Sequence, residues 1–479
     1  MTPDTSAVYR IAAGGTDERP GHHEGKRRAT RKPSSSLDEG YRAATNGPAD
    51  RLAEVSKPRL LVLTTTFPRN AEDSTPSFVL NLCKRLQAQF DVTVLAPATR
   101  GARHRDEVEG VQVRRFRYFW PRSLELLAEG ALLESVRQRR WLFLQAPFLL
   151  LSELVAAYVW ARRSKPVVIH AHWLIPQGIV AVLVGGLLNI PVVVTAHGAD
   201  VSGLRGWPWS AVRRAIAARS KAITVVSSDL KKRLDGVVSG LGQAPLVMPM
   251  GVDSDRFLAA EAAWPANDKT VLFVGRLAEK KGLEYLLRAF PQVLSHHPDA
   301  RLVVVGDGPM RAMLEALVTT LGLGGNVDFL GGKPPSELPR LYSSCRVFVG
   351  PSVVARSGDT EGFGLVFIEA FAAGRPVVAT SVGGIPDIVV QGRTGLLVEP
   401  GSPDALAVAI CELLDSPATA DRMGQVARRW VRRKFDWRTV GAGYATLLAK
   451  TAGQAMTAAP SDKAARDRLD HQSRRRKGA

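Results

Sequence analysis

Cysteine is scarce in this chain of 479 residues, which contains only Cys83, Cys345 and Cys411. Three cysteines far apart in the sequence exclude a fold that depends on a framework of disulfide bonds. Their number predicts reduced thiols and a cytoplasmic protein. None of them has the spacing of a metal site, so the cysteines predict no metal cofactor.

Acidic residues are also few, because 64 lysines and arginines face 45 aspartates and glutamates, giving a formal net charge of +19. Such a balance favours anionic partners: nucleotide diphosphates, acidic lipid headgroups or nucleic acid. Aromatic residues are not interleaved with the basic ones as in nucleic-acid-binding proteins, so we expect no nucleic-acid partner. The basic run 474–477 is more typical of a solvated extension than of a site.

Both ends of the chain lack apolar periodicity. Residues 1 to about 57 are rich in glycine, proline, serine, arginine and glutamate, and residues 451–479 show little apolar patterning. This composition predicts a disordered N-terminal leader and a disordered basic tail. The leader contains no apolar core of the signal-peptide type, so export is not indicated.

Between these ends, short β-branched runs alternate with loops and helical segments. In the first half they include 59–64, 91–96 and 191–195, and a second series opens with 270–275. Strand, loop, helix and strand in this order begin a parallel sheet with right-handed crossovers. The sequence therefore predicts an α/β protein whose ligands bind at the carboxyl ends of the strands.

The stretch 347–380 organises the second series. Its run Val347–Val349 predicts a buried strand, followed by a polar loop and a helix that opens near Phe363–Gly364. Free amides and the helix dipole make such a corner suited to anions. Glu361 and Glu369 bracket this opening, and carboxylates there are better suited to holding hydroxyls of a ribose and a sugar than a phosphate.

Two cations lie near the start of the second series. Arg276 directly follows the run 270–275, and Lys281 precedes the helix predicted from Leu283. Cations beside free helix amides suit a diphosphate leaving group. If these two side chains neutralise such a leaving group, a metal is not chemically required.

One further pattern, Asp253–Asp255, has the Asp-x-Asp form that chelates a divalent metal in some enzymes. Its position favours a different role, the capping of a short helix over 256–260. We therefore predict no metal ligand in the chain.

Histidines follow two of the buried runs of the first half. His170 and His172 share one face of a strand because strand residues alternate with a period of two, and packing explains them better than metal binding. His197 opens a turn with Gly198 and Asp200 just past the next strand. This position places its imidazole at the carboxyl edge of the sheet, where a site residue is expected.

The stretch around the two glutamates carries a resemblance to a known family. The matching residues are Glu361, Gly362, Phe363, Gly364 and Glu369. They look like the Glu-x7-Glu signature of the group-1 (family 4) retaining glycosyltransferases. The resemblance extends from about residue 58 to residue 444 through further motifs, including Gly-Arg-x5-Gly around Arg276 and His-Gly-x-Asp from His197.

The resemblance implies the GT-B fold, in which two Rossmann-like domains face a central cleft and a C-terminal helix crosses back to the first domain. We predict these domains over 58–250 and 251–435, and the returning helix over 436–450. The first would take the acceptor and the second the nucleotide-sugar donor.

Roles in the donor site also follow from the resemblance. Glu369 would hold the ribose hydroxyls of the donor, and Glu361 with the amides of Phe363–Leu365 would hold its sugar. His197 would contact the sugar in the catalytic centre. Arg276 and Lys281 would stabilise the charge that develops when the bond to phosphate breaks.

Acceptor contacts are less specific. The family usually carries a glycine pair in the first loop, but Asp73, Ser74 and Thr75 occupy it here. These three residues are candidate acceptor contacts. His172 is similar to a family histidine at the interdomain cleft, so contact with acceptor or sugar stays open for it. Asp200 would orient either His197 or the acceptor.

The most apolar region, 141–160, has arginine pairs at both ends. Three structures fit it: a membrane span, a core or interface helix, and a monotopic helix on an anionic membrane. Polar and proline residues inside the region disfavour the span. The core helix and the monotopic helix both stay open. The monotopic helix predicts an anionic membrane partner and a peripheral position on the inner face of the plasma membrane.

The predicted function is retaining transfer of a hexose from a GDP- or UDP-linked donor to a glycan or lipid-linked acceptor, without a metal, in polysaccharide or glycoconjugate synthesis. A nucleotide-sugar epimerase of the same fold and a non-catalytic basic membrane scaffold are the alternatives. A hydrolase using Glu361 and Glu369 is disfavoured chiefly by Arg276 and Lys281, which suit a diphosphate leaving group. Eight residues of continuous helix would also span about 12 Å, more than the roughly 5–9.5 Å between hydrolase carboxyls, although Glu361 precedes the helix.

Overall fold

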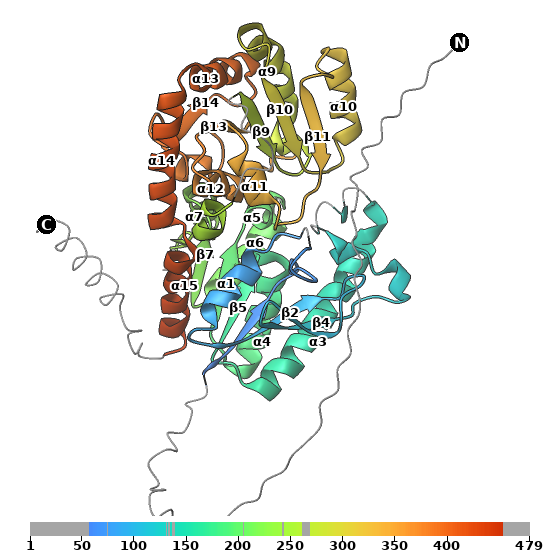
Figure 1. The fold of residues 1–479 in the computed structure, drawn as a ribbon. Helices are drawn as coiled ribbons and strands as arrows, with labels where there is room; N and C mark the ends of the chain where they lie inside the picture. Colours follow the sequence, from blue (N-terminus) through green and yellow to red (C-terminus); the bar gives the residue numbers. More distant parts are fainter. Residues whose placement is uncertain are drawn as a thin grey trace, which may run out of the picture. The chain divides into compact units, whose positions relative to one another are not determined.

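The computed structural model describes residues 57–453, with gaps at 74, 131, 133–134, 137–138, 205, 242–243 and 261–268. The leader predicted for 1–57 and the tail predicted for 451–479 lie almost entirely outside the described residues, as does the basic run 474–477. Within the described part, two sheets are flanked by helices (Figure 1).

The first sheet has eight strands. In spatial order they are β3 (Arg105–Val108), β4 (Val111–Phe116), β2 (Asp91–Pro97), β1 (Arg59–Leu63), β5 (Val168–His172), β6 (Val192–Ala196), β7 (Ala222–Val225) and β8 (Leu246–Val247). Only β3 and β4 pair antiparallel. In register, Val62 of β1 is opposite Val94 of β2 and His170 of β5. Without β3 and β8 the order is that of a Rossmann sheet, which reverses between β1 and β5 and binds ligands at that point.

Helices connect these strands. They are α1 (Phe78–Leu86), α3 (Ala146–Ser164), α4 (Ile179–Leu188), α5 (Ala199–Ser202), α6 (Trp207–Arg219) and α7 (Ser228–Val238). Single turns occupy η1 (Arg122–Leu124), η2 (Leu127–Glu129), η3 (Arg140–Gln145) and η4 (Leu174–Gly178). Figure 1 shows α3 and α4 beside the first sheet, and they pack against each other.

The apolar region of the first half forms η3 and α3. It is the one helix in the described ranges that is long and apolar enough to cross a membrane by length and composition. Every fourth residue from Leu149 to Ala161 is buried. The helix therefore packs onto the domain through one stripe, as expected for a core or surface helix.

The second sheet has six parallel strands. In spatial order they are β11 (Val327–Gly331), β10 (Arg301–Val305), β9 (Thr270–Val274), β12 (Val347–Gly350), β13 (Val377–Thr380) and β14 (Gly395–Val398). This is again the Rossmann order, reversing between β9 and β12. The register pairs Leu272 of β9 with Phe348 of β12.

Helices on the second sheet follow the same pattern. They are α8 (Ser254–Leu258), α9 (Leu283–His296), α10 (Arg311–Thr320), α11 (Leu338–Ser343), α12 (Leu365–Ala372), α13 (Pro403–Asp415) and α14 (Pro417–Lys434), with turns η5 (Glu279–Lys281) and η6 (Ile385–Asp387). Alternation along the strands divides the core. Leu272 and Val274 join a core shared with the first sheet, whereas Val271 and Phe273 join a separate core on the opposite face.

The last helix, α15 (Trp437–Thr451), returns to the first sheet. It packs against α1, where a Cβ on Gly441 would lie 2.6 Å from the Cβ of Arg85. The Tyr444 hydroxyl donates a 2.9 Å hydrogen bond to the Met248 carbonyl. The predicted fold, with two Rossmann-like sheets and a helix that crosses back, is confirmed. All three cysteines are free thiols in the structure.

Candidate functional site

The loop between β12 and α12 has a backbone that depends on glycine. Gly364 adopts φ +99° immediately before the helix, and a Cβ there would lie 2.5 Å from the Phe367 ring. Side chains are disfavoured at such a φ. The chain therefore turns sharply, and α12 begins at Leu365, one residue after the predicted opening. Glu361 lies in the loop and Glu369 lies inside the helix.

Two ion pairs join this loop to the loop after β9. Lys281 Nζ lies 2.5 Å from Glu361 Oε2, and Lys280 Nζ lies 3.1 Å from Asp359 Oδ2. Burial by itself raises the pKa of Glu361, but the positive charges of Lys281 and Lys280 outweigh it and hold that pKa below its ordinary value. Glu361 is therefore an ionised hydrogen-bond acceptor at neutral pH.

Glu369 is held by a different partner. The Tyr342 hydroxyl, on α11, donates a 2.9 Å hydrogen bond to Glu369 Oε2. Burial raises the pKa of Glu369, while this hydrogen bond and the charges of Arg256 and Lys281 oppose the rise. One carboxylate oxygen is thus fixed, which leaves the other to accept from a ligand hydroxyl.

Arg276, the other cation predicted for the site, lies two residues after the end of β9 and is exposed. It therefore lies at the same carboxyl edge as Lys281, where the order of the second sheet reverses.

His197 lies on a turn at the carboxyl edge of the first sheet. Asp200 Oδ1 accepts hydrogen bonds from the backbone N–H groups of His197 (3.2 Å) and Gly198 (2.9 Å), and its Oδ2 accepts from Leu174 (2.8 Å). The rings of Phe78 and Trp173 lie 5.0 and 4.8 Å from the imidazole, centroid to centroid. Both backbone and ring of His197 are thereby restrained.

The two loops meet. A Cβ on Gly362 would lie 2.4 Å from the carbonyl oxygen of His197, and a Cβ on Gly198 would lie 3.2 Å from the Gly362 Cα. Only glycine permits such a close approach of two backbones. The structure therefore places the Glu361 loop of the second sheet directly beside the His197 turn of the first.

A second glycine pair completes this contact. The N–H of Gly384 donates to the Glu361 carbonyl at 3.0 Å, and a Cβ on Gly383 would lie 2.1 Å from the same oxygen. Asp387 then accepts a hydrogen bond from the Ser228 N–H of the first domain at 2.5 Å. The close approach that the sequence suggested for Gly383 and Gly384 is to the Glu361 loop itself.

Three of the candidate acceptor or cleft residues are enclosed: Asp73, Asp200 and His172 are at most 6% exposed. Asp73 accepts from Arg69 and Thr75, Asp200 holds the His197 turn, and His172 is fully buried. The carboxylates of Asp73 and Asp200 are used inside the protein. Asp200 orients the backbone of His197, which is one of the two roles predicted for it. Thr75 donates its hydroxyl to Asp73. Ser74 lies outside the described residues.

Asp73 supplies a stability prediction. Burial raises its pKa, but hydrogen bonds from Arg69 and Thr75 and the charge of Arg69 lower it far below the ordinary value. A lowered folded-state pKa contributes stability above the unfolded value of about 3.9, and this is lost as pH falls below it. We expect Asp73→Asn to reduce the free energy of unfolding by about 1–2 kcal/mol at pH 7.

The matched control for this change is Asp91→Asn. Its pair with Arg59 is 3.7 Å long and both side chains are 57% exposed, so an effect within about 0.5 kcal/mol is expected. Chemical denaturation at pH 7 and pH 3 measures both variants. An Asp73→Asn effect that does not shrink at pH 3 would show that ionisation of Asp73 is not its source.

The Asp253–Asp255 segment caps a helix, as predicted. Asp253 precedes α8 and its side chain accepts from the Arg256 N–H. Within the described ranges, no group of three or more histidine, cysteine or acidic side chains is arranged to hold a metal.

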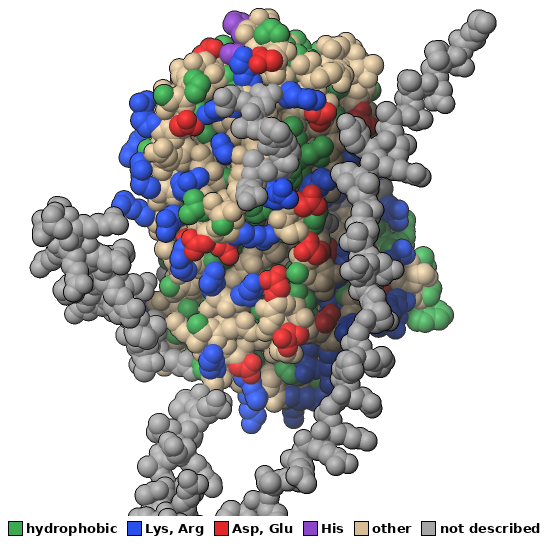
Figure 2. Space-filling view, in the orientation of Figure 1, with side chains coloured by type: hydrophobic (Ala, Val, Ile, Leu, Met, Phe, Trp, Pro, Cys, Tyr) green, Lys and Arg blue, Asp and Glu red, His purple; other side chains and the backbone are tan. Residues whose placement is uncertain are grey.

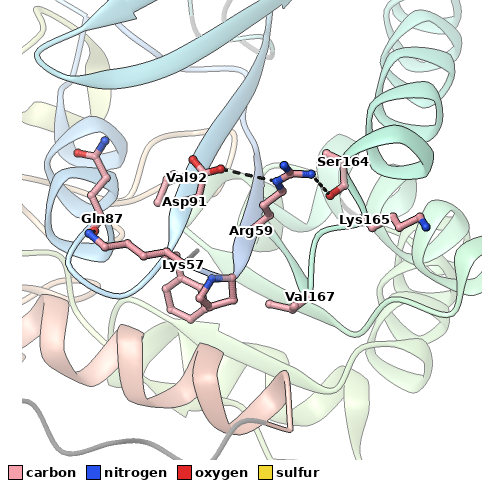
Figure 3. Close-up of a pocket in the computed structure, with 10 residues that line it drawn as sticks. Lys57, Arg59, Gln87, Asp91, Val92, Ser164, Lys165 and Val167 are labelled. Carbon is pink, nitrogen blue, oxygen red and sulfur yellow. Dashed lines mark hydrogen bonds and ion pairs between the residues drawn. The ribbon is translucent and has the colours of Figure 1, made fainter. Parts of the chain in front are cut away.

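A large cavity of about 690 Å³ lies at the opposite, amino end of the first sheet (Figure 3). Its cations are already engaged: Lys57 donates to the Gln87 carbonyl, and Arg59 lies between Asp91 and the Ser164 carbonyl. Figure 3 shows Lys165 pointing away from them. This cavity therefore lacks the convergent free groups of a ligand site.

Sequence reasoning missed three residues beside the site: Tyr342, Lys280 and Asp359. Asp359 and Glu361 lie two residues apart, and Lys280 and Lys281 are adjacent. That parallel spacing is the signal that could have suggested two ion pairs. Nothing in the local pattern around Tyr342 indicates its bond to Glu369.

The structure combines two Rossmann-like sheets with a lysine and two glutamates at the carboxyl edge of one sheet and a histidine turn at the carboxyl edge of the other. This combination defines a GT-B sugar transferase. The comparisons agree. Residues 254–430 match the family model for glycosyl transferases group 1, and residues 76–248 match the glycosyl transferase 4-like domain. The chain belongs to the group-1 glycosyltransferases.

Curated relatives include two kinds of enzyme. The GDP-mannose-dependent alpha-(1-6)-phosphatidylinositol monomannoside mannosyltransferase of Mycolicibacterium smegmatis is 35% identical over 258 residues, covering 51% of this chain and 67% of that protein. The D-inositol 3-phosphate glycosyltransferase of Corynebacterium glutamicum is 37% identical over 193 residues, covering 39% of this chain and 44% of that protein. The matches thus span about two thirds of the first relative and less than half of the second.

Solved structures show the same fold. Sucrose-phosphate synthase from Thermosynechococcus elongatus superposes with a TM-score of 0.67 at 25% identity, covering 82% of this chain and 99% of the other. HepE from Anabaena, in complex with UDP, gives a TM-score of 0.62 at 20% identity, covering 82% of this chain and all of the other.

Proposed function

We propose that this chain transfers a hexose from a nucleoside-diphosphate sugar to a glycan or lipid-linked acceptor, with retention at the anomeric carbon. The observation that carries the proposal is the contact of the Glu361 loop, with its bound Lys281, against the His197 turn. This contact brings together a cation for the leaving group, a carboxylate that accepts hydrogen bonds from sugar hydroxyls, and an imidazole.

The donor would lie mainly on the second sheet. The free oxygen of Glu369 would accept from ribose hydroxyls, and the amides at the start of α12 would hold the sugar with Glu361. An ammonium has three donors, so Lys281 can hold Glu361 and a phosphate oxygen together. The relatives' dependence on GDP-mannose makes GDP-mannose the first donor to test, with UDP-sugars second.

Bond changes follow from this placement. The acceptor hydroxyl oxygen bonds to the anomeric carbon on the face from which the diphosphate departs, and its proton passes to the departing phosphate oxygen. Lys281 and Arg276 stabilise the charge that develops on that phosphate, which lowers the barrier only as the bond breaks. Because these side chains supply the positive charge, the proposal needs no metal.

Hydrolysis by the two glutamates is not supported by their surroundings. Glu361 is paired with Lys281, and Glu369 accepts a hydrogen bond from the Tyr342 hydroxyl, so both carboxylates are engaged as hydrogen-bond acceptors. No observation favours epimerisation or a non-catalytic scaffold, so neither alternative is carried further.

Donor binding gives the first test of function. We expect one donor class among GDP-mannose, UDP-glucose and ADP-glucose, measured in EDTA, to raise the melting temperature of the wild type. At 100 times Kd the stabilisation is about 2.7 kcal/mol. GDP and UDP alone should reproduce part of the shift. If no nucleotide or nucleotide sugar shifts the transition, the proposed donor site is contradicted.

We propose that the protein binds its acceptor at the surface of an anionic membrane. The outer stripe of η3 and α3 exposes large apolar side chains: Leu144 (68%), Phe148 (53%), Leu151 (59%) and Val155 (54%). Exposed arginines flank it at both ends: Arg139, Arg140, Arg162 and Arg163. Hydrophobic side chains project at the right of Figure 2 beside Lys and Arg. An apolar stripe rimmed by cations suits the interface of acidic lipids.

We expect the wild type to float with phosphatidylglycerol vesicles and not with phosphatidylcholine vesicles. The double variant Leu144→Asp/Leu151→Asp should lose at least about tenfold in bound fraction, because each leucine contributes about 1.5–3 kcal/mol on burial. Val408→Asp on α13, where valine is 60% exposed, is the control and should float normally. Equal flotation of all three would contradict this surface. Flotation would also support a peripheral cytoplasmic location.

A further inference from the structure

Two imidazole rings are in direct contact at the carboxyl edge of the first sheet. His172, the last residue of β5, places its Nδ1 3.0 Å from Nε2 of His197, and the rings stack at 5.2 Å between centroids. His172 is 0% exposed, whereas His197 is partly exposed. Of the two, only His197 can contact a substrate.

Both rings are neutral at ordinary pH. Burial lowers the pKa of His197 to about 3 and lowers the pKa of His172 well below its usual range. A neutral imidazole has one N–H donor and one bare nitrogen. In the contact, therefore, one ring donates and the other accepts, and there are two possible arrangements.

The second ring nitrogen of His172, Nε2, distinguishes these two arrangements. Its Nε2 is buried and has no hydrogen-bond partner in the part of the chain that the structure describes. If His197 donated, His172 would carry its proton on this Nε2, and an orphaned buried N–H costs about 1–3 kcal/mol. If His172 donates, its Nε2 is a bare acceptor, and unpaired buried acceptors are more common than unpaired N–H groups.

The groups around His172 are consistent with His172 as the donor in this contact. The ring of His170 lies 4.4 Å from that of His172, centroid to centroid, but its Nε2 contacts the Thr195 hydroxyl at 2.8 Å. Its Nδ1 also has no partner in the described structure. No neighbouring side chain therefore pairs with a proton on Nε2 of His172.

We propose that His172 is a positioning residue: it donates from Nδ1 to Nε2 of His197 and so fixes His197 as the tautomer that carries its proton on Nδ1. The Nδ1 of His197 makes no hydrogen bond to the described residues, so this N–H is available to a hydroxyl of the donor sugar. Asp200 fixes the backbone of the same residue, and His172 fixes its ring. The use of this N–H in transfer rests on the proposed function, whereas the tautomer does not.

The tautomer can be measured without any activity. Two-dimensional ¹⁵N–¹H spectra of the histidine-labelled full chain, with His197 assigned by its loss in His197→Asn, report which ring nitrogen is protonated. We expect Nδ1 of His197 to be protonated and Nε2 to be a bare acceptor. A proton on Nε2 of His197 overturns the proposal, whether or not the chain transfers sugar.

Variants test the consequence for catalysis. His172→Asn and His172→Asp are nearly equal in size, but only the asparagine amide can donate from the position of Nδ1. We expect His172→Asn to keep kcat/KM within about threefold, and His172→Asp and His172→Leu to lose about 10–100-fold. His170→Asn is the control, because His170 packs on the same buried face without touching His197.

Binding of GDP or UDP, which does not involve His197, separates this effect from misfolding. The melting-temperature shift given by the nucleotide should be the same in all folded variants. Equal activity of His172→Asn and His172→Asp would indicate a merely structural role and overturn the proposal. If the variants do not fold, the spectra of the wild type still decide it.

Discussion

Replacing Lys281 with methionine is expected to lower kcat/KM for sugar transfer by about 10²–10³-fold, equal to about 2.7–4 kcal/mol of barrier. The ammonium of Lys281 would neutralise the diphosphate as its bond to the sugar breaks. Lys280 does not replace it, because the Lys280 ammonium is paired with Asp359. The measurement is initial-rate kinetics with the donor identified by the melting experiment.

Loss of Lys281 also leaves Glu361 as a charge without its partner in a site where that side chain is only 11% exposed. For a fully buried pair this costs about 3–5 kcal/mol, which is the upper bound here. The double variant Lys281→Met/Glu361→Gln removes both charges. It should regain most of the stability and none of the activity, which separates the fold from the chemistry.

Lys280→Met is the matched control, since it breaks the parallel pair in the same loop. We expect its effect on kcat/KM to be less than about tenfold. If Lys280→Met and Lys281→Met lost activity equally, the specific placement of Lys281 against the leaving group would be wrong.

Glu369→Ala is expected to weaken donor binding by about 30-fold or more, since a charged hydrogen-bond acceptor contributes about 1.5–3 kcal/mol and the ribose offers two hydroxyls. The melting-temperature shift that the donor gives to the wild type should then largely disappear. Isothermal titration with the nucleoside diphosphate measures the same loss as a change in Kd.

Tyr342→Phe tests how Glu369 is held. Removing the hydroxyl removes the 2.9 Å bond to Oε2 but leaves the carboxylate in place. We expect a smaller loss of affinity, about 3–10-fold, from a carboxylate that is no longer oriented. Normal donor binding by Glu369→Ala would contradict the assignment of the ribose to this residue.

Much of the fold was predictable from the sequence because its central strands are buried on both faces. Runs such as Val347–Val349 are continuous and β-branched, which identifies buried parallel strands. The strand β3 was missed for the opposite reason: Arg105–Val108 is polar and lies at the antiparallel edge, where an apolar pattern is not required.

The site was predictable only in part. Residue type and position at strand ends indicated Glu361, Lys281 and His197, because the carboxyl edges of parallel sheets collect functional residues. The pattern could not show which side chains meet between loops. The bond from Tyr342 to Glu369 and the contact of His172 with His197 join segments that are 27 and 25 residues apart.

The sequence also did not indicate which polar loop residues are buried. Asp73 and Asp200 are polar residues in loops at the correct edge, so the sequence predicted Asp73 as an acceptor contact and Asp200 as a residue that orients His197 or the acceptor. In the structure their carboxylates are the partners of Arg69 and of backbone N–H groups, so they shape the loops. A buried polar group must be paired, and such pairs form locally in loops that bend back on themselves.

A crystal structure of the chain with the nucleoside diphosphate selected by the melting experiment tests the central claim most directly. The account predicts diphosphate oxygens within hydrogen-bond distance of Lys281 Nζ and ribose hydroxyls on the Glu369 carboxylate. The terminal phosphate, to which the sugar is attached in the donor, should face His197. A nucleotide bound with its diphosphate away from Lys281, for example in the cavity beside Arg59, would contradict it.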